Sequence, residues 1–182
     1  MSDLITLAGL DAQPLEWRQP ALGRTFELTG PTGPHARLEL KKLAGSLALG
    51  TTARVSFAFE RQGMLKSHID IRFANSDSSF AVYEPHFTGQ KGHLNYPGGQ
   101  SLEFQSTNFF ATEWQWVTPA GDGLVGFKTS QAGKPNAKVF LSDNVLDRVD
   151  IDLLLLLGFY LLLLIREAAE SQSQHLQITA TR

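Results

Sequence analysis

The sequence predicts a mainly β protein: a closed antiparallel barrel of about twelve strands around a hydrophobic C-terminal helix. Two observations predict it. Residues 153–165 read LLLLLGFYLLLLI and carry no charge. Much of the preceding chain alternates apolar and polar residues in short runs separated by Gly, Pro, Asn and Asp, a pattern typical of strands joined by tight turns. A chain of 182 residues can also bury a sizeable core without disulfides, and this one contains no cysteine.

Residues 1–20 are expected to form an N-terminal segment outside the barrel. Asp3 stands where a secretory signal needs positive charge, and Pro14 interrupts the apolar stretch, so we expect no signal peptide. Ser2 and Asp3 could cap one short helix over Leu4–Ala8. The barrel is expected over residues 21–170 and a C-terminal tail over 171–182, where His175–Thr179 reads either as an added strand or as a disordered tail.

The strands of the barrel are expected wherever alternation is bounded by turn residues. Ten such segments stand out, and the full number should be ten to twelve. They are Arg24–Thr29, Ala36–Lys41, Arg54–Glu60, Leu65–Phe73, Phe80–Tyr83, Gly92–Asn95, Ser101–Gln105, Phe109–Val117, Leu124–Thr129 and Lys138–Leu141. Because these runs follow one another without intervening helices, an antiparallel meander is expected, and closing it removes the exposed edges of the sheet.

The leucine-rich run is expected to form a helix over about residues 150–169. Asp150 and Asp152 near its start and Arg166 after the run complement the helix dipole. The helix is apolar on every face, so protein or lipid must surround it. Thirteen residues span about 20 Å, whereas a bilayer core needs about 30 Å, so the length favours the axle of a barrel over a membrane anchor.

The order of several segments carries a family resemblance. They are Phe57-Ala58-Phe59, Ile69-Asp70-Ile71, Trp114-Gln115-Trp116 with the turn Gly121-Asp122-Gly123, and the run from Asp152 to Arg166. Over most of residues 20–170 the chain resembles the tubby-like superfamily, which includes the tubby C-terminal domain, the LURP-one-related proteins and the phospholipid scramblases. The resemblance implies a twelve-stranded barrel around a hydrophobic helix. Trp114 and Trp116 share one face of their strand, which we expect to point inward toward the helix; a ligand-lining or interface pair is the alternative.

The resemblance bears on function mainly through its departures. No cysteine cluster, proline-rich tail or acidic calcium-binding segment matches those of scramblases, so lipid scrambling is not expected. The phosphoinositide site of tubby proteins uses basic residues outside the barrel. The nearest candidates here are Lys41, Lys42 and Arg54, which we take as a tentative surface for an anionic ligand.

Other motifs indicate no chemistry. Gly121–Gly126 matches G-x-G-x-x-G, but a strand-like run follows it, so it predicts a hairpin turn rather than a nucleotide site. His86 and His93 have the spacing of hairpin flanks, and no metal or other cofactor is predicted. No nucleophile elbow or singled-out carboxylate pair predicts catalysis. A net charge of −2, with no basic run longer than Lys41-Lys42, argues against nucleic acid as a partner.

The sequence therefore predicts a non-enzymatic binding module, cytoplasmic and peripheral to a membrane, whose ligand is an anionic lipid headgroup or a protein. Two alternatives stay open at this point. The leucine-rich run could anchor a cytoplasmic β domain in a membrane, or a barrel mouth near His86 and His93 could bind a small molecule.

Overall fold

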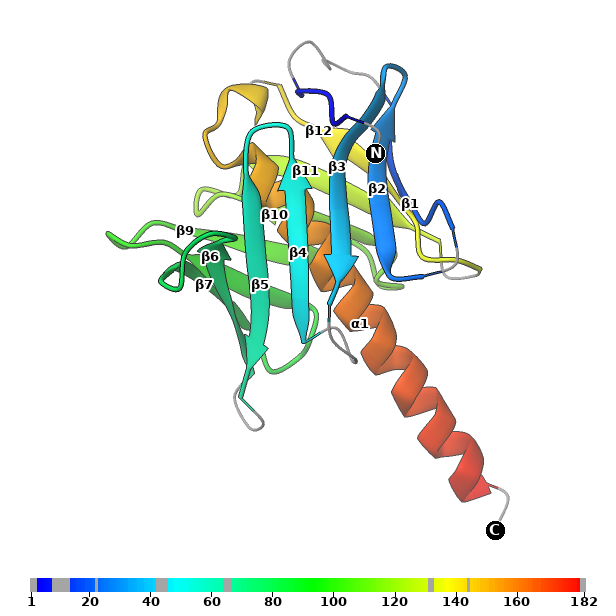
Figure 1. Ribbon diagram of the computed structural model, residues 1–182. Coiled ribbons are helices and arrows are strands. Elements are labelled where there is room, and N and C mark those ends of the chain that lie inside the picture. Colours follow the sequence, from blue (N-terminus) through cyan, green and yellow to red (C-terminus); the bar gives the residue numbers. More distant parts are fainter. Residues whose placement is uncertain are drawn as a thin grey trace.

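The protein is a twelve-stranded barrel with one long helix, as seen in a computed structural model (Figure 1). The structure describes residues 3–7, 14–21, 23–41, 46–63, 67–130, 133–143 and 145–180, with only the backbone for 175–180. The strands are β1 (Leu15–Arg18), β2 (Thr25–Gly30), β3 (Gly33–Leu40), β4 (Leu47–Thr52), β5 (Ser56–Gln62), β6 (His68–Phe73), β7 (Ser79–Pro85), β8 (Lys91–Asn95), β9 (Ser101–Ser106), β10 (Glu113–Val117), β11 (Gly123–Thr129) and β12 (Ala137–Leu141). A 3-10 turn, η2 (Val145–Asp147), precedes the helix α1 (Ile151–Ala180).

The strands pair antiparallel in sequence order, and the sheet closes on itself. β1 pairs with β2 on one side and with β12 on the other, where Leu15 lies opposite Val139 and Trp17 opposite Ala137. Because the sheet closes, each of the twelve described strands has a neighbour on both sides. The predicted fold class is confirmed.

The first part of α1 lies inside the barrel. Residues 151–162 are buried on every face of the helix. The ring of Phe159 stacks on Trp17 of β1, with centroids 4.6 Å apart, and Trp116 of β10 donates from Nε1 to the Leu154 carbonyl at 2.9 Å. These contacts come from widely separated strands, so the barrel surrounds the leucine-rich run, and Trp114 and Trp116 both face inward as expected.

Two glycines allow the helix to pass close to the barrel wall. A Cβ on Gly158 would lie 2.4 Å from Cζ of Phe127. A Cβ on Gly50 of β4 would lie 3.0 Å from both Leu156 methyl carbons. Such distances leave no room for a side chain. Glycine at these two positions therefore lets the helix and the barrel wall approach closely.

No helix within the described ranges is long and apolar enough to cross a bilayer.

The structure corrects the expected boundaries in several places. β1 lies within the segment expected to precede the barrel, and β4 was not expected at all. Asp3–Leu7 is not helical, and its Ile5 N–H donates to the Pro34 carbonyl at 2.8 Å; the rest of the expected short helix lies outside the described residues.

Two further differences concern the second half of the chain. Residues 109–112, expected at the start of a strand, form a loop before β10. The helix does not end near residue 169 but continues to Ala180, so the alternating His175–Thr179 is helical rather than a strand or a disordered tail. A helix nucleated in the core extends without the nucleation cost of a new one.

The barrel has two different ends. At the proximal end, α1 enters the barrel, and this end carries the β2–β3, β4–β5, β6–β7, β8–β9 and β10–β11 turns. At the distal end, α1 leaves, and its C-terminal part projects beyond the strands (Figure 1). The turns β3–β4, β5–β6, β7–β8, β9–β10 and β11–β12 lie at the distal end.

Candidate functional site

The cations singled out in the sequence do not assemble into one surface. Lys41 follows β3 at the distal end, where its Nζ lies 2.7 Å from Oε2 of Glu39. Arg54 lies in the β4–β5 turn at the proximal end, and the whole of β4 separates the two. Lys42 lies outside the described residues. The two described cations are thus at opposite ends of the barrel, each beside a carboxylate.

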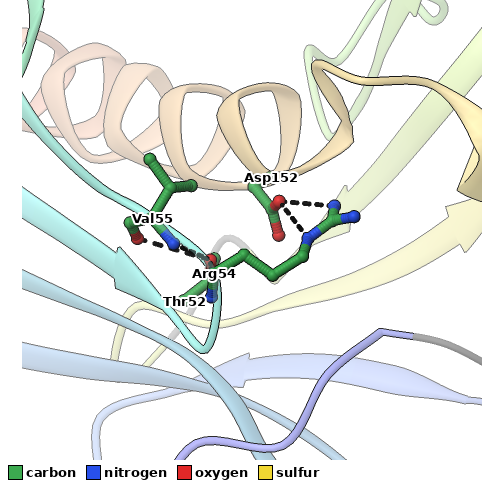
Figure 2. Close-up of polar contacts among 4 residues, drawn as sticks. All are labelled: Thr52, Arg54, Val55 and Asp152. Carbon is green, nitrogen blue, oxygen red and sulfur yellow. Dashed lines mark hydrogen bonds and ion pairs between the residues drawn. The ribbon is translucent and has the colours of Figure 1, made fainter.

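Arg54 is committed to an ion pair with the helix (Figure 2). Its Nε and Nη2 donate to Oδ2 of Asp152 at 2.8 and 2.5 Å. The turn holds Arg54 in place, because Oγ1 of Thr52 accepts from the N–H groups of Arg54 and Val55, each at 3.2 Å. The side chain of Asp152 is 5% exposed and that of Arg54 is 49% exposed. Arg54 therefore helps to hold the start of the core helix, and its role toward an anionic ligand stays a prediction.

A second polar cluster holds the first turn of α1. The carbonyl of Asp150 accepts from the Leu154 N–H at 3.0 Å, so Asp150 is the N-cap of the helix. Its carboxylate accepts from Nε and Nη2 of Arg148 and from the Tyr96 hydroxyl, each at 2.8 Å. Burial, and next the charge of Asp150, raise the pKa of Tyr96 above its ordinary value. The polar groups of the proximal end thus close the core.

The distal end, by contrast, presents aromatic side chains to solvent. Phe87 in the β7–β8 turn is fully exposed, and Phe109 and Phe110 in the β9–β10 loop are 92% and 73% exposed. The two turns lie on the same stretch of rim, because β8 and β9 pair with each other and the Ser106 N–H donates to the Gln90 carbonyl at 2.9 Å. Exposed aromatics on neighbouring turns make this stretch of the rim a candidate interaction site.

The β9–β10 loop is built to hold its aromatics outward. Oδ1 of Asn108 accepts from the N–H groups of Thr112 and Glu113 at 3.0 and 3.3 Å. Ala111 takes φ +50°, a left-handed conformation that costs a residue with a side chain about 1–2 kcal/mol. Its carbonyl accepts from Nε1 of Trp114 at 2.8 Å. Strain held in place by surrounding contacts is typical of functional loops, so this loop is a candidate binding element.

Phe87 is presented by a tighter turn. The His86 N–H donates to the Lys91 carbonyl at 2.8 Å, and the Gly89 N–H donates to the His86 carbonyl at 2.9 Å. Gly89 takes φ +68°, a conformation that glycine adopts without strain. The turn therefore places Phe87 at the tip of the hairpin, where its side chain is exposed.

The histidines near this turn have separate neighbours. Nδ1 of His86 lies 3.3 Å from Oγ1 of Thr88, and Nε2 of His93 lies 3.4 Å from Oε2 of Glu103. Among the described residues there is no cluster of three His, Cys, Asp or Glu side chains placed to hold a metal ion.

Charges around the aromatics are balanced. Nζ of Lys91 lies 3.2 Å from Oε2 of Glu103, and Nζ of Lys128 lies 2.8 Å from Oε1 of Glu113. Apolar surface is therefore the main chemical character of this part of the rim.

The sequence pattern does not distinguish these phenylalanines from core residues. Phe109 and Phe110 were expected at the start of a strand, although adjacent residues of a strand point to opposite faces and cannot both enter the core. The signal that could have found them is Asn108 directly before two adjacent aromatics, because Asn favours turns.

Comparison of this chain with protein-family models, with curated proteins and with solved structures finds no match.

Proposed function

We propose that this protein is a non-enzymatic binding module that attaches to lipid surfaces through its distal end. The observation that carries the proposal is that two neighbouring turns hold Phe87, Phe109 and Phe110 in solvent. Aromatic side chains partition favourably into the interface of a bilayer, and binding strength there increases with the apolar area that becomes buried.

In this proposal, affinity for the bilayer comes mainly from insertion of the phenylalanine rings and not from attraction between cations and anionic headgroups. Two cations of the neighbouring strands, Lys91 and Lys128, lie beside carboxylates, so they should add little to the binding of anionic headgroups. The three rings lie on the β7–β10 side of the rim, so the barrel would dock tilted, with the projecting part of α1 beside the contact. Membership of the tubby-like superfamily and a cytoplasmic location stay predictions.

Because α1 fills the barrel, binding on the outer surface is favoured over carriage of a ligand inside the lumen. The side chains of α1 occupy the lumen, where Leu154, Leu156 and Tyr160 are wholly buried, so a ligand would be bound at a rim or on the outer wall. A protein partner docking on the same aromatics is the second candidate, because exposed aromatics also anchor protein interfaces.

Vesicle flotation of the full-length protein tests the proposal. We expect the protein to float with phosphatidylcholine vesicles and to do so nearly as well in 0.5 M salt, since screening weakens charge pairs but not apolar insertion. Each partly inserted ring should supply about 1 kcal/mol. The double variant Phe87→Ser/Phe109→Ser should therefore bind about 30-fold more weakly.

A matched control uses apolar residues away from the distal rim. Phe140 on the outer face of β12 and Val149 before α1 are 56% and 99% exposed. Phe140→Ser/Val149→Ser should float like the unaltered protein. Failure of the unaltered protein to float with either zwitterionic or phosphatidylserine-containing vesicles would overturn the lipid proposal and leave the protein partner. Equal losses in the two double variants would also overturn it.

A further inference from the structure

A groove of about 530 Å³ lies between the emerging part of α1 and the distal rim. This volume is in the range of small-molecule sites. The groove has an apolar floor and a polar margin. Its floor includes Trp114, Phe159, Leu162 and Leu163, and its margin includes Asn136, Arg166 and Glu170.

The floor of the groove is buried and held in place. Trp114, Phe159 and Leu162 are at most 7% exposed. Nε1 of Trp114 donates a hydrogen bond to the Ala111 carbonyl, and the ring of Phe159 stacks on Trp17. No polar atom of these side chains is therefore left to serve a ligand, and the floor fits a hydrocarbon chain. Because the walls are already ordered, binding costs little rearrangement.

The margin supplies one cation in a fixed position. Nη2 of Arg166 donates to the Gly133 carbonyl at 2.6 Å, and its Nε donates to Oε1 of Glu170 at 2.8 Å. Nη1 makes no hydrogen bond to the part of the chain that the structure describes, so it remains a donor for a carboxylate. Glu170 is 61% exposed, and such exposed pairs are weak. A ligand carboxylate could displace its side chain into solvent.

We propose that this groove binds a single-chain amphiphile with a carboxylate head, such as a fatty acid, with the chain on the apolar floor and the head at Arg166. The groove takes a monomeric ligand between helix and barrel; Phe110 lines it as well as the distal rim, whereas Phe87 belongs to the rim alone. Glu170 competes with the ligand carboxylate for Arg166 and so lowers the affinity.

Titration calorimetry of the full-length protein with decanoate, decanol and decyltrimethylammonium tests the chemistry of the head. These amphiphiles share one chain length and differ in charge. We expect saturable binding of decanoate, about tenfold weaker binding of decanol and the weakest binding of the cation. Arg166→Gln should remove the preference for decanoate, and Glu170→Gln should tighten decanoate binding several-fold. A preference for decanoate that survives Arg166→Gln would overturn the assignment of the head.

Two neighbouring alanines of α1 allow a matched test of whether decanoate binds in this groove. Ala169 and Ala168 are both exposed on α1; Ala169 lines this groove, whereas Ala168 lines a smaller hollow of about 160 Å³ elsewhere on the distal rim. Ala169→Trp should abolish decanoate binding and Ala168→Trp should leave it unchanged. No saturable binding, or equal effects of the two variants, would overturn the proposal.

The two proposals can fail separately. Phe87 does not line the groove, so Phe87→Ser should weaken vesicle flotation without changing decanoate binding. Ala169→Trp should abolish decanoate binding without preventing flotation. If one substitution removed both, the groove would not be a separate site, and the inference would be wrong.

Discussion

The two ends of the barrel use polar and apolar groups in opposite ways. At the proximal end, Arg54 pairs with Asp152, and Arg148 and Tyr96 hold Asp150, so charged groups fix the start of the core helix. At the distal end, Phe87 and Phe109 project into solvent, and the helix leaves the barrel beside an apolar groove. The polar groups of the proximal end thus hold the core helix, whereas the distal end exposes apolar side chains. Substitutions at the two ends should therefore alter stability and the proposed binding independently.

The largest effect is expected in the helix that the two ends share. Leu156 is wholly buried in the lumen, and Leu156→Asp would place an unpaired carboxylate there. The cost of several kcal/mol is comparable to the whole stability of a domain, so no folded barrel should form. Circular dichroism and soluble yield measure this, with Ala169→Asp on the exposed part of α1 as a control that folds. A folded barrel in Leu156→Asp would show that the strands do not need their helix.

The next largest effect is expected from breaking the ion pair at the proximal end, which should cost more stability than breaking the one at the distal end. Arg54→Ala leaves Asp152 buried without its partner and should lower the free energy of unfolding by about 3 kcal/mol, whereas Asp152→Asn leaves a half-exposed arginine and should cost about 1 kcal/mol. Arg166→Gln at the distal end should cost at most about 1 kcal/mol, because its pair is exposed.

Denaturant unfolding at neutral pH measures all three variants. If Arg54→Ala and Arg166→Gln cost the same, the two ends do not differ in their contribution to stability. If Asp152→Asn costs as much as Arg54→Ala, the burial of the carboxylate is not the reason for the larger effect.

The last prediction concerns alkaline pH, where the effect of a single substitution is small. Burial raises the pKa of all three tyrosines, Tyr83, Tyr96 and Tyr160, above the ordinary value of 10.0. The folded state keeps their protons while the unfolded state loses them, so stability is full below pH 10 and falls above it. The slope should approach about 4 kcal/mol per pH unit with three tyrosines. Tyr96→Phe should reduce the slope by a third in unfolding experiments between pH 9 and 11; an unchanged slope would contradict this.

The sequence was enough to predict the barrel and the place of its helix, because a helix that is apolar on all faces needs walls on all sides. It was not enough to find β4, since Gly50 weakens the strand pattern; the glycine is there because Leu156 approaches it. β1 was missed because this strand has only four residues and lies between Pro14 and Pro20, which interrupt the strand pattern.

The candidate site was less predictable than the fold. Arg54 was expected to face a ligand, but its partner Asp152 is distant in sequence, so no local pattern indicates the ion pair. Phe109 and Phe110 look like core residues by composition. Only the hydrogen bonds of Asn108 and the left-handed Ala111, which depend on the folded loop, turn them outward.

The pairing of β1 with β12 also bears on how the chain is made. Ribosomes synthesise every strand before α1, so the nascent strands carry apolar inner faces for which no filling yet exists. The sheet can close only after its last strand arrives, and it gains its core only when the leucines of α1 follow. Chains of this kind fold late and are exposed to aggregation until then. During translation, the apolar inner faces of the strands therefore lack their core until the leucine-rich part of α1 has been synthesised.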